Sequence, residues 1–253
     1  KTFVFFIGYP RSGHSLVGAC LDAHPNAVIS HELDALSLVM EGKSRLQLFE
    51  AICEKARLFY EQGNEWSGYS YRVPDMWQGL EKSIEVIGDK RGGLSTNHLE
   101  AYPELLEKVK DLAANYRMIH VVKNPFDCIS TAVMRQEKLQ GRKFSAEDIN
   151  RKIKEFFNRA RTNSSIIEKV PDRVMTIRYE NLLKDSEAVL SQLCTFLGLT
   201  IFDDYLKACS SIIWPSGRPS RLKSTIWEPS LIEFVQEQID QFYIFEGYNF
   251  QSE

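Results

Sequence analysis

The chain has 253 residues, with 31 Lys+Arg against 34 Asp+Glu, a formal net charge of −3 and 43% hydrophobic residues. This length suits one α/β domain with a full core, and the composition excludes disordered, collagen-like and coiled-coil proteins. The negative charge argues against nucleic acid as the main partner, but it leaves room for a local basic pocket. The apolar runs, such as residues 3–7, are too short for a membrane-spanning segment.

Five cysteines are scattered along the chain without a CxxC pair, so the sequence indicates neither a disulfide framework nor a zinc site. We therefore expect no metal requirement. The first residue leads directly into an apolar run, and no signal peptide is visible. A cytoplasmic protein and a Golgi-lumen protein that has lost an N-terminal anchor both remain open, and the sequence indicates no oligomeric state.

Short apolar runs rich in β-formers alternate with longer segments of helical periodicity. The predicted strands cover residues 2–8, 27–30, 84–88, 117–122 and 173–178. The predicted helical segments cover residues 16–24, 33–62, 102–112, 125–138, 145–168, 185–197 and 229–243. Strands that alternate with helices imply βαβ units. The sequence therefore predicts a single α/β domain over residues 1–253, with a central, mostly parallel sheet of about five strands flanked by helices, like a P-loop NTPase.

A glycine-containing turn, Gly8-Tyr-Pro-Arg-Ser-Gly-His-Ser15, connects the first strand to the first helix. At such a turn, backbone N–H groups and the helix N-terminus face the same point, so we expect an anion site. The spacing matches G-x-x-x-x-G-K-[ST], except that His14 replaces the lysine. A histidine that is largely neutral at pH 7 is a poor substitute, which disfavours an ordinary ATPase or GTPase. The cation of this turn is Arg11.

The same turn, together with Leu-Asp-Ala-His-Pro at residues 21–25, resembles the 5′-phosphosulfate loop of PAPS-dependent sulfotransferases. The Golgi tyrosylprotein branch and its bacterial relatives are the most similar. The resemblance implies PAPS as the cofactor and PAP as the product, and it assigns the phosphosulfate to Arg11, Ser12, Gly13, His14 and Ser15. The family usually has two threonines at the last two positions. Because backbone amides do much of the phosphate binding, this replacement weakens the match only slightly.

A second family element follows the fourth strand. Sulfotransferases hold the 3′-phosphate of the cofactor with Arg-(Asn/Asp)-Pro and a hydroxyl residue eight positions after the arginine. This chain has Lys123-Asn-Pro125 and Thr131 in these places, and Arg135 matches a further basic position of the tyrosylprotein branch. Lysine keeps the charge of the family's arginine but lacks its bidentate fork. A cation at this end of a strand is also where an open α/β sheet binds ligands.

Two later segments complete the predicted cofactor site. Tyr179, in the run Ile-Arg-Tyr-Glu-Asn-Leu-Leu at residues 177–183, corresponds to a cofactor contact of the family. The family also has a basic cofactor loop in the region of residues 216–224, which carries Arg218, Arg221 and Lys223 and no acidic residue. A solvated basic loop is an equally good interpretation of that segment.

The general base is predicted directly after the second strand. In the tyrosylprotein branch the catalytic glutamate stands eight residues after the histidine of Asp-Ala-His-Pro, and that position is Glu32. His31 is the rival, since histidine is the base in cytosolic sulfotransferases. Adjacent residues on a strand point to opposite faces, so we expect only one of the two to serve, and we favour Glu32.

A lysine, Lys90, follows the third predicted strand. The family places a lysine here, near the bridging oxygen, so the resemblance implies that Lys90 stabilises the leaving group and that Arg11 shares this role. Sulfuryl transfer needs a base, cations at the transferring and leaving oxygens, and an in-line arrangement.

The acceptor is less well defined. Six aromatic residues gather in one segment, namely Phe59, Tyr60, Trp66, Tyr69, Tyr71 and Trp77. They either roof an acceptor pocket or pack on the core. The segment is not basic, whereas an enzyme that binds acidic tyrosine peptides needs positive charge there. A small hydroxylated molecule, a glycan and a tyrosine peptide all remain candidates.

The leading hypothesis is therefore a PAPS-dependent sulfotransferase that moves a sulfuryl group to a hydroxyl or amine. One alternative is a P-loop nucleotide-dependent kinase, which His14 and the lack of an evident Asp-Asp pair for magnesium disfavour. The other is a non-catalytic nucleotide-binding protein of the same fold.

Overall fold

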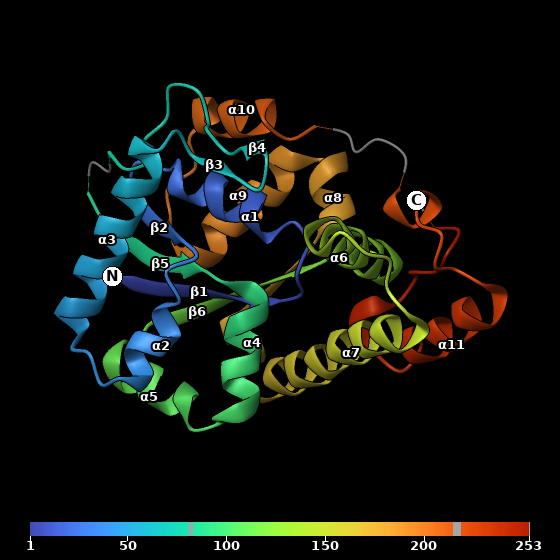
Figure 1. Cartoon of the computed structure of the whole chain (residues 1–253). Coiled ribbons are helices and arrows are strands. Elements are labelled where there is room, and N and C mark those ends of the chain that lie inside the picture. The colour runs from blue at the N-terminus through green and yellow to red at the C-terminus, as the bar shows by residue number, and fades with distance from the viewer. Residues whose placement is uncertain (81–82, 215–218, 253) are drawn as a thin grey trace.

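A parallel sheet forms the centre of the molecule (Figure 1). The computed structural model describes residues 1–80, 83–214 and 219–252. Within these ranges the main sheet has five strands in the order β2 (Ala27–His31), β5 (Val86–Lys90), β1 (Thr2–Gly8), β6 (Tyr116–Val122) and β7 (Val174–Arg178). All neighbouring strands pair in parallel. The predicted α/β fold with a mostly parallel sheet of about five strands is confirmed.

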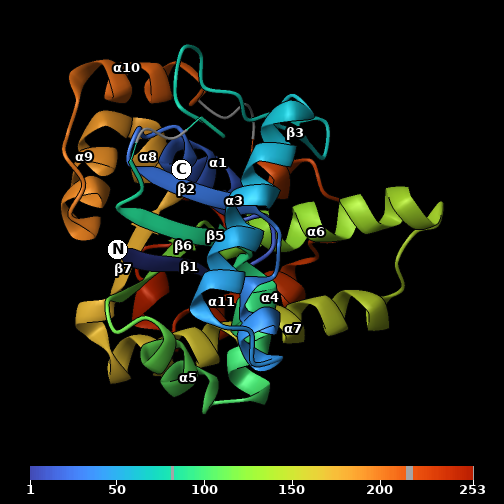
Figure 2. The same cartoon turned by 90° about the vertical axis from the view of Figure 1, so that its left-hand side faces the viewer.

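Both faces of the sheet are covered, because its strands are apolar on both sides. In β1, alternate side chains enter opposite cores, with Val4 and Phe6 on one face and Phe3, Phe5 and Ile7 on the other. The first face is covered by α1 (His14–Asp22), α8 (Tyr179–Lys184), α9 (Ser186–Leu197) and α10 (Asp203–Ser211). The second is covered by α2 (Ala35–Met40), α3 (Arg45–Glu61), α4 (Gly92–Ala101) and α5 (Leu105–Leu112) (Figure 2).

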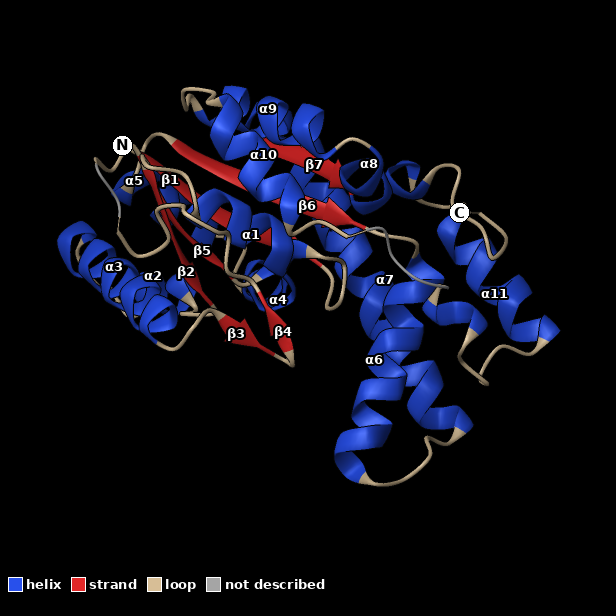
Figure 3. Ribbon diagram, turned by 90° about the horizontal axis from the view of Figure 1, so that it is seen from above, coloured by secondary structure: helices blue, strands red, loops and turns tan. Residues whose placement is uncertain are grey.

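A third core lies beyond the end of the sheet. It joins α6 (Pro125–Gln140) and α7 (Ala146–Lys169), which form a projecting hairpin, to α11 (Pro229–Ile239) (Figure 3). A capping box at Ser145 and Asp148 begins α7. Arg221 and Asp127 form a buried ion pair of 2.6 Å that ties the chain after α10 to α6.

Several local predictions were wrong. β5 ends at Lys90, so this lysine is the last residue of the strand rather than a residue after it. The helix α4 was not predicted, and α5 begins three residues later than the predicted helix at 102. The short helices α8 and α10 were also missed, and α11 ends at Ile239. The segment predicted as a loop at residues 63–79 contains a small hairpin of β3 (Glu65–Trp66) and β4 (Tyr69–Ser70).

Across the parts of the chain that the structure describes, no helix combines the length and the apolar character needed to cross a membrane.

Candidate active site

The predicted catalytic residues and the phosphate loop lie at the carboxyl ends of neighbouring strands. Because the strands are parallel, these ends meet at one edge of the sheet. The phosphate loop follows β1, His31 ends β2, Lys90 ends β5, and Lys123 follows β6. The register pairs His31 directly with Lys90. Parallel pairing therefore brings together residues that lie far apart in the sequence.

Lys90 links the phosphate loop to the two candidate bases. Its Nζ lies 3.0 Å from Ser15 Oγ, 3.1 Å from His31 Nε2 and 2.6 Å from Glu32 Oε1. The lysine is 1% exposed. Burial lowers the pKa of Lys90 from its ordinary value, and the charge of Glu32 opposes that shift. One buried amine thus contacts both the loop expected to hold an anion and the expected base.

Glu32 turns back towards Lys90, as does His31. The strand ends at His31, and Glu32 has a left-handed backbone with φ of 61°. This conformation breaks the alternation of side chains along a strand. The expectation that His31 and Glu32 point to opposite faces is therefore wrong, since both side chains contact the same Lys90 amine.

A buried carboxylate, Asp89, holds the turn that carries Glu32. It accepts hydrogen bonds from the Ser30 hydroxyl and from the backbone amides of Leu33, Asp34 and Ala35. Burial raises the pKa of Asp89, and these donors oppose the rise. The turn is thus fixed by a strand neighbour far away in sequence.

Arg91 is a site residue that the sequence did not single out. Its Nη1 lies 2.8 Å from Glu32 Oε2 and 3.2 Å from the Glu32 carbonyl oxygen, so it holds both ends of that residue. The Glu32 side chain remains 21% exposed, which leaves the carboxylate accessible. The only sequence signal for Arg91 was its position directly after Lys90. None of the family motifs described above includes it.

His31 is held as a neutral ring. Burial, followed by the charge of Lys90, lowers the pKa of His31 to about 2. The ring stacks on Phe59, with centroids 4.3 Å apart. A base works best when its pKa lies near the working pH, so this histidine is a weak proton acceptor.

The phosphate loop is shaped by glycine and covered by Tyr179. Gly13 has φ of 97°, and a Cβ at this position would lie 2.3 Å from the Tyr179 ring. Lys123 Nζ lies 4.7 Å from the centroid of the same ring, a cation–π distance. The three family elements predicted from separate parts of the sequence therefore meet at Tyr179.

Two cations lie at the phosphate loop, Arg11 within it and Lys90 at the end of β5, whereas His14 is buried and neutral. Burial, followed by the charges of Lys90 and Arg11, holds the pKa of His14 well below its ordinary value. Arg11 Nε is buried and has no hydrogen-bond partner among the described residues. Buried donors are almost always paired, so this N–H is suited to donate a hydrogen bond to an anion bound at the loop. The amides at the start of α1 add further donors.

The predicted 3′-phosphate residues are less closely gathered. Thr131 Oγ1 donates a hydrogen bond to Ser220 Oγ at 2.9 Å, whereas the side chains of Arg135 and Lys223 are exposed. Arg221 is 3% exposed; it pairs with Asp127 and also donates to the carbonyls of Phe250 and Ser252. Its guanidinium is thus occupied by the protein itself. Arg218 lies outside the described residues.

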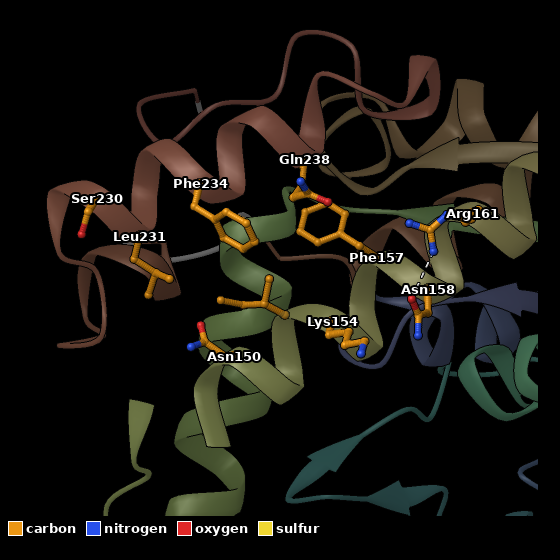
Figure 4. Close-up of a pocket in the computed structure, with 10 residues that line it drawn as sticks. Asn150, Lys154, Phe157, Asn158, Arg161, Ser230, Leu231, Phe234 and Gln238 are labelled. Carbon is orange, nitrogen blue, oxygen red and sulfur yellow. Dashed lines mark hydrogen bonds between the residues drawn. The ribbon is translucent and has the colours of Figure 1, made fainter. Parts of the chain in front are cut away.

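A separate groove of about 710 Å³ lies between α7 and α11. Figure 4 shows Phe157 of α7 and Phe234 of α11 reaching towards it. None of its ten lining residues is a predicted site residue. Among the described residues, no group of three or more His, Cys, Asp or Glu side chains is placed to hold a metal ion.

Comparison with known proteins identifies the family. The sulfotransferase family model matches residues 4–204, which is most of the chain. This protein therefore belongs to the sulfotransferase family. The resemblance inferred from the motifs is confirmed, and the kinase alternative is not favoured. A search of curated proteins finds no significant match.

Solved sulfotransferase structures share the fold over nearly the whole chain. The sulfotransferase domain from the curacin biosynthetic pathway has a TM-score of 0.59 and 21% identity, over 94% of this chain and 96% of that chain. The sulfotransferase domain of the Synechococcus PCC 7002 olefin synthase has a TM-score of 0.54 and 18% identity, over 93% and 87%. Mouse sulfotransferase SULT7A1, complexed with PAP, has a TM-score of 0.54 and 16% identity, over 95% and 84%.

Proposed function

We propose that this protein transfers the sulfuryl group of PAPS to a hydroxyl or amine of an acceptor by in-line displacement. The observation that carries the proposal is the position of Lys90, whose amine contacts both Ser15 of the phosphate loop and the carboxylate of Glu32. The PAP complex of the structurally similar mouse sulfotransferase supports PAPS as the donor. The proposal includes no metal.

Glu32 is the proposed general base. Its carboxylate takes the proton of the acceptor hydroxyl as the acceptor oxygen bonds to sulfur. The bond between sulfur and the 5′-phosphate oxygen breaks, and its electron pair stays on that oxygen. Lys90 and Arg11 stabilise the charge there, so that PAP leaves and the sulfuryl group ends on the acceptor. The low pKa of His31, about 2, supports Glu32 over its neighbour.

For the donor we propose two groups of contacts. The phosphosulfate lies against Arg11, Ser12, Gly13, His14 and Ser15, and the nucleotide with its 3′-phosphate lies against Lys123, Thr131, Arg135, Tyr179, Arg218 and Lys223. We also assign Arg221 to the nucleotide contacts, but in an indirect role, because its own guanidinium pairs with Asp127. Arg221 holds the neighbouring Ser220 in place beside Thr131. Residues 1–253 form one domain in this proposal, which the packing of residues 221–250 on α6 supports.

Thermal unfolding with added nucleotides tests this function. A ligand at a hundred times its Kd stabilises the folded state by about 2.7 kcal/mol, so PAP and PAPS should each raise the Tm clearly. ATP with Mg²⁺ should have little effect, since the loop lacks the lysine of nucleoside triphosphatases. Stabilisation by ATP with Mg²⁺ but not by PAP would contradict the proposal.

A further inference from the structure

The β3–β4 hairpin presents exposed aromatic rings close to Glu32. Trp66 and Tyr69 are direct cross-strand partners, so their side chains lie on the same face of the hairpin. Trp66 is 44% exposed and Tyr69 is 59% exposed. Neighbouring exposed aromatic rings of this size commonly mark a binding surface. The β7 edge of the sheet and the α7–α11 groove are not involved.

This face of the hairpin is directed towards the candidate base. The ring of Trp66 meets the ring of His31 edge-on, with centroids 5.3 Å apart, and the centroid of the Tyr71 ring lies 5.8 Å from that of His31. Figure 3 shows the hairpin beyond the end of β2. His31 is the residue directly before Glu32. The aromatic face therefore lies beside the carboxylate that removes the acceptor proton, on the side of β2 rather than of β6 and Lys123.

The hairpin is anchored at its base. The backbone amide of Tyr71 donates to the Asn64 carbonyl at 2.9 Å, and Gln78 Nε2 donates to the Tyr71 carbonyl at 2.9 Å and to the Ala19 carbonyl of α1 at 3.4 Å. Burial raises the pKa of Tyr71, and a hydrogen bond with Ser15 partly offsets the rise, which places this hydroxyl at the phosphate loop. The aromatic face thus has a fixed position relative to the site.

The charge of this segment argues against an anionic acceptor. Residues 61–75 carry three acidic side chains, Glu61, Glu65 and Asp75, against one basic side chain, Arg72. The guanidinium of Arg72 lies over the ring of Tyr60, 5.5 Å from its centroid. The segment itself therefore lacks the excess of basic side chains that a peptide with acidic residues around its tyrosine needs for binding.

We propose that the face formed by Trp66, Tyr69 and Tyr71 selects an uncharged, flat aromatic acceptor, such as a small phenol, and presents its hydroxyl to Glu32. Flat rings stack on or meet these side chains edge-on, whereas a glycan offers less apolar surface to them. The inference rests on the proposed function. The transfer step is unchanged: the phenol loses its proton to Glu32 and its oxygen takes the sulfuryl group.

Steady-state kinetics with defined acceptors test the inference. The probes are 2-naphthol, a tyrosine peptide with acidic flanks and a neutral disaccharide, each with PAPS. We expect the highest kcat/KM for 2-naphthol, and we expect Trp66→Ala to raise its KM about tenfold while the KM for PAPS is unchanged. Trp66→Phe should recover most of the loss. Trp77→Ala is the matched control, because Trp77 is a tryptophan of the same segment and is 38% exposed. Unlike Trp66, it is not among the rings that contact His31 in the described residues, which are Phe59, Trp66 and Tyr71.

Two results would overturn the inference alone. One is a higher kcat/KM for the acidic peptide or the disaccharide than for 2-naphthol. The other is a Trp66→Ala variant with an unchanged KM for 2-naphthol, or with a raised KM for PAPS instead. The same preparations are tested for stabilisation by PAP. Its absence in the wild-type protein would overturn the proposed function, and this inference with it.

Discussion

The two sides of the site are built differently. The donor side is made of strand ends and the phosphate loop, where Gly13 fits beneath Tyr179 and Lys123 lies over the same ring. The acceptor side is made of the turn at Glu32 and a hairpin with exposed Trp66 and Tyr69. The donor side rests on short local motifs around Gly13 and Lys123, whereas the acceptor side depends on contacts between segments far apart in the sequence. This difference explains why the donor motifs appear in the sequence and the acceptor does not.

The largest expected effect is on the acceptor side alone. Glu32→Gln should lower kcat by about 10²–10⁴-fold, because it removes the proposed general base while keeping a hydrogen-bond acceptor for Lys90. PAP should still stabilise the variant as it does the wild-type protein. The measurements are initial rates and Tm shifts with PAP. Full activity of Glu32→Gln would show that the base is another residue.

Lys90 contacts both the donor side and the acceptor side, so its replacement should affect both the donor KM and kcat. Lys90→Met should lower kcat by about 10²–10³-fold, because a preorganised donor to the leaving oxygen is lost. The donor KM should also rise, since the amine contacts Ser15 of the phosphate loop. Lys154→Met, at an exposed lysine of α7, is the control and should leave both parameters unchanged. Equal kinetics for the two variants would exclude Lys90 from the reaction.

A glycine pair tests the donor side separately. Gly13→Ala should weaken PAP binding at least about tenfold, because it forces a left-handed alanine into the Tyr179 ring, where a Cβ would lie 2.3 Å away. Gly42→Ala is the matched control: Gly42 also has a positive φ, of 75°, but no atom lies within 4 Å of its added Cβ. It should cost about 1–2 kcal/mol of stability, because alanine is strained in the left-handed conformation, and leave PAP binding intact. Isothermal calorimetry with PAP measures both, and tight binding by Gly13→Ala would show that the close fit is unnecessary.

Arg91 should have a smaller effect, because it acts through Glu32. Arg91→Gln should lower kcat about tenfold without changing the KM for PAPS, since the carboxylate loses one of its two supports. Arg142→Gln provides the comparison, because the exposed Arg142 makes an Arg–carboxylate pair of the same 2.8 Å length with Asp148 at the start of α7. A raised KM for PAPS in Arg91→Gln would place this arginine on the donor side.

The smallest expected effect is on the pH dependence when His31 is replaced. A pKa of about 2 leaves His31 neutral between pH 5 and pH 8, because burial and then the charge of Lys90 disfavour its proton. His14, Lys55 and Arg91 add to the same shift. His31→Asn should therefore leave the shape of the kcat profile unchanged over this range. Loss of an acid limb near pH 6 in this variant would identify His31 as the base.

Particular residues show how far the sequence could predict this protein. The five strands and the phosphate loop were readable, because apolar runs end at glycine or at polar turns. The helix α4 was not, because it starts at Gly92 and Gly93, which are poor helix formers, and it is stabilised by packing on β1. The orientation of Glu32 depends on Asp89, a partner 54 to 59 residues away from the groups it holds.

Arg221 illustrates the limit for charged loops. Its sequence neighbours suggested a cation free for a phosphate, but its guanidinium pairs with Asp127, 94 residues earlier in the chain. Local charge does not reveal such a distant partner. The same holds for Arg91, whose role depends on the left-handed turn at Glu32 rather than on any spacing.

The most direct test of the central claim is the stoichiometry of transfer from labelled PAPS. The wild-type protein should release one PAP for each sulfate ester formed when it is given PAPS with 2-naphthol, the tyrosine peptide or the disaccharide. Glu32→Gln should form neither product at a comparable rate. Stabilisation by PAP without any sulfate ester from these acceptors would contradict the account, because it would leave a nucleotide-binding protein of this fold without the proposed transfer.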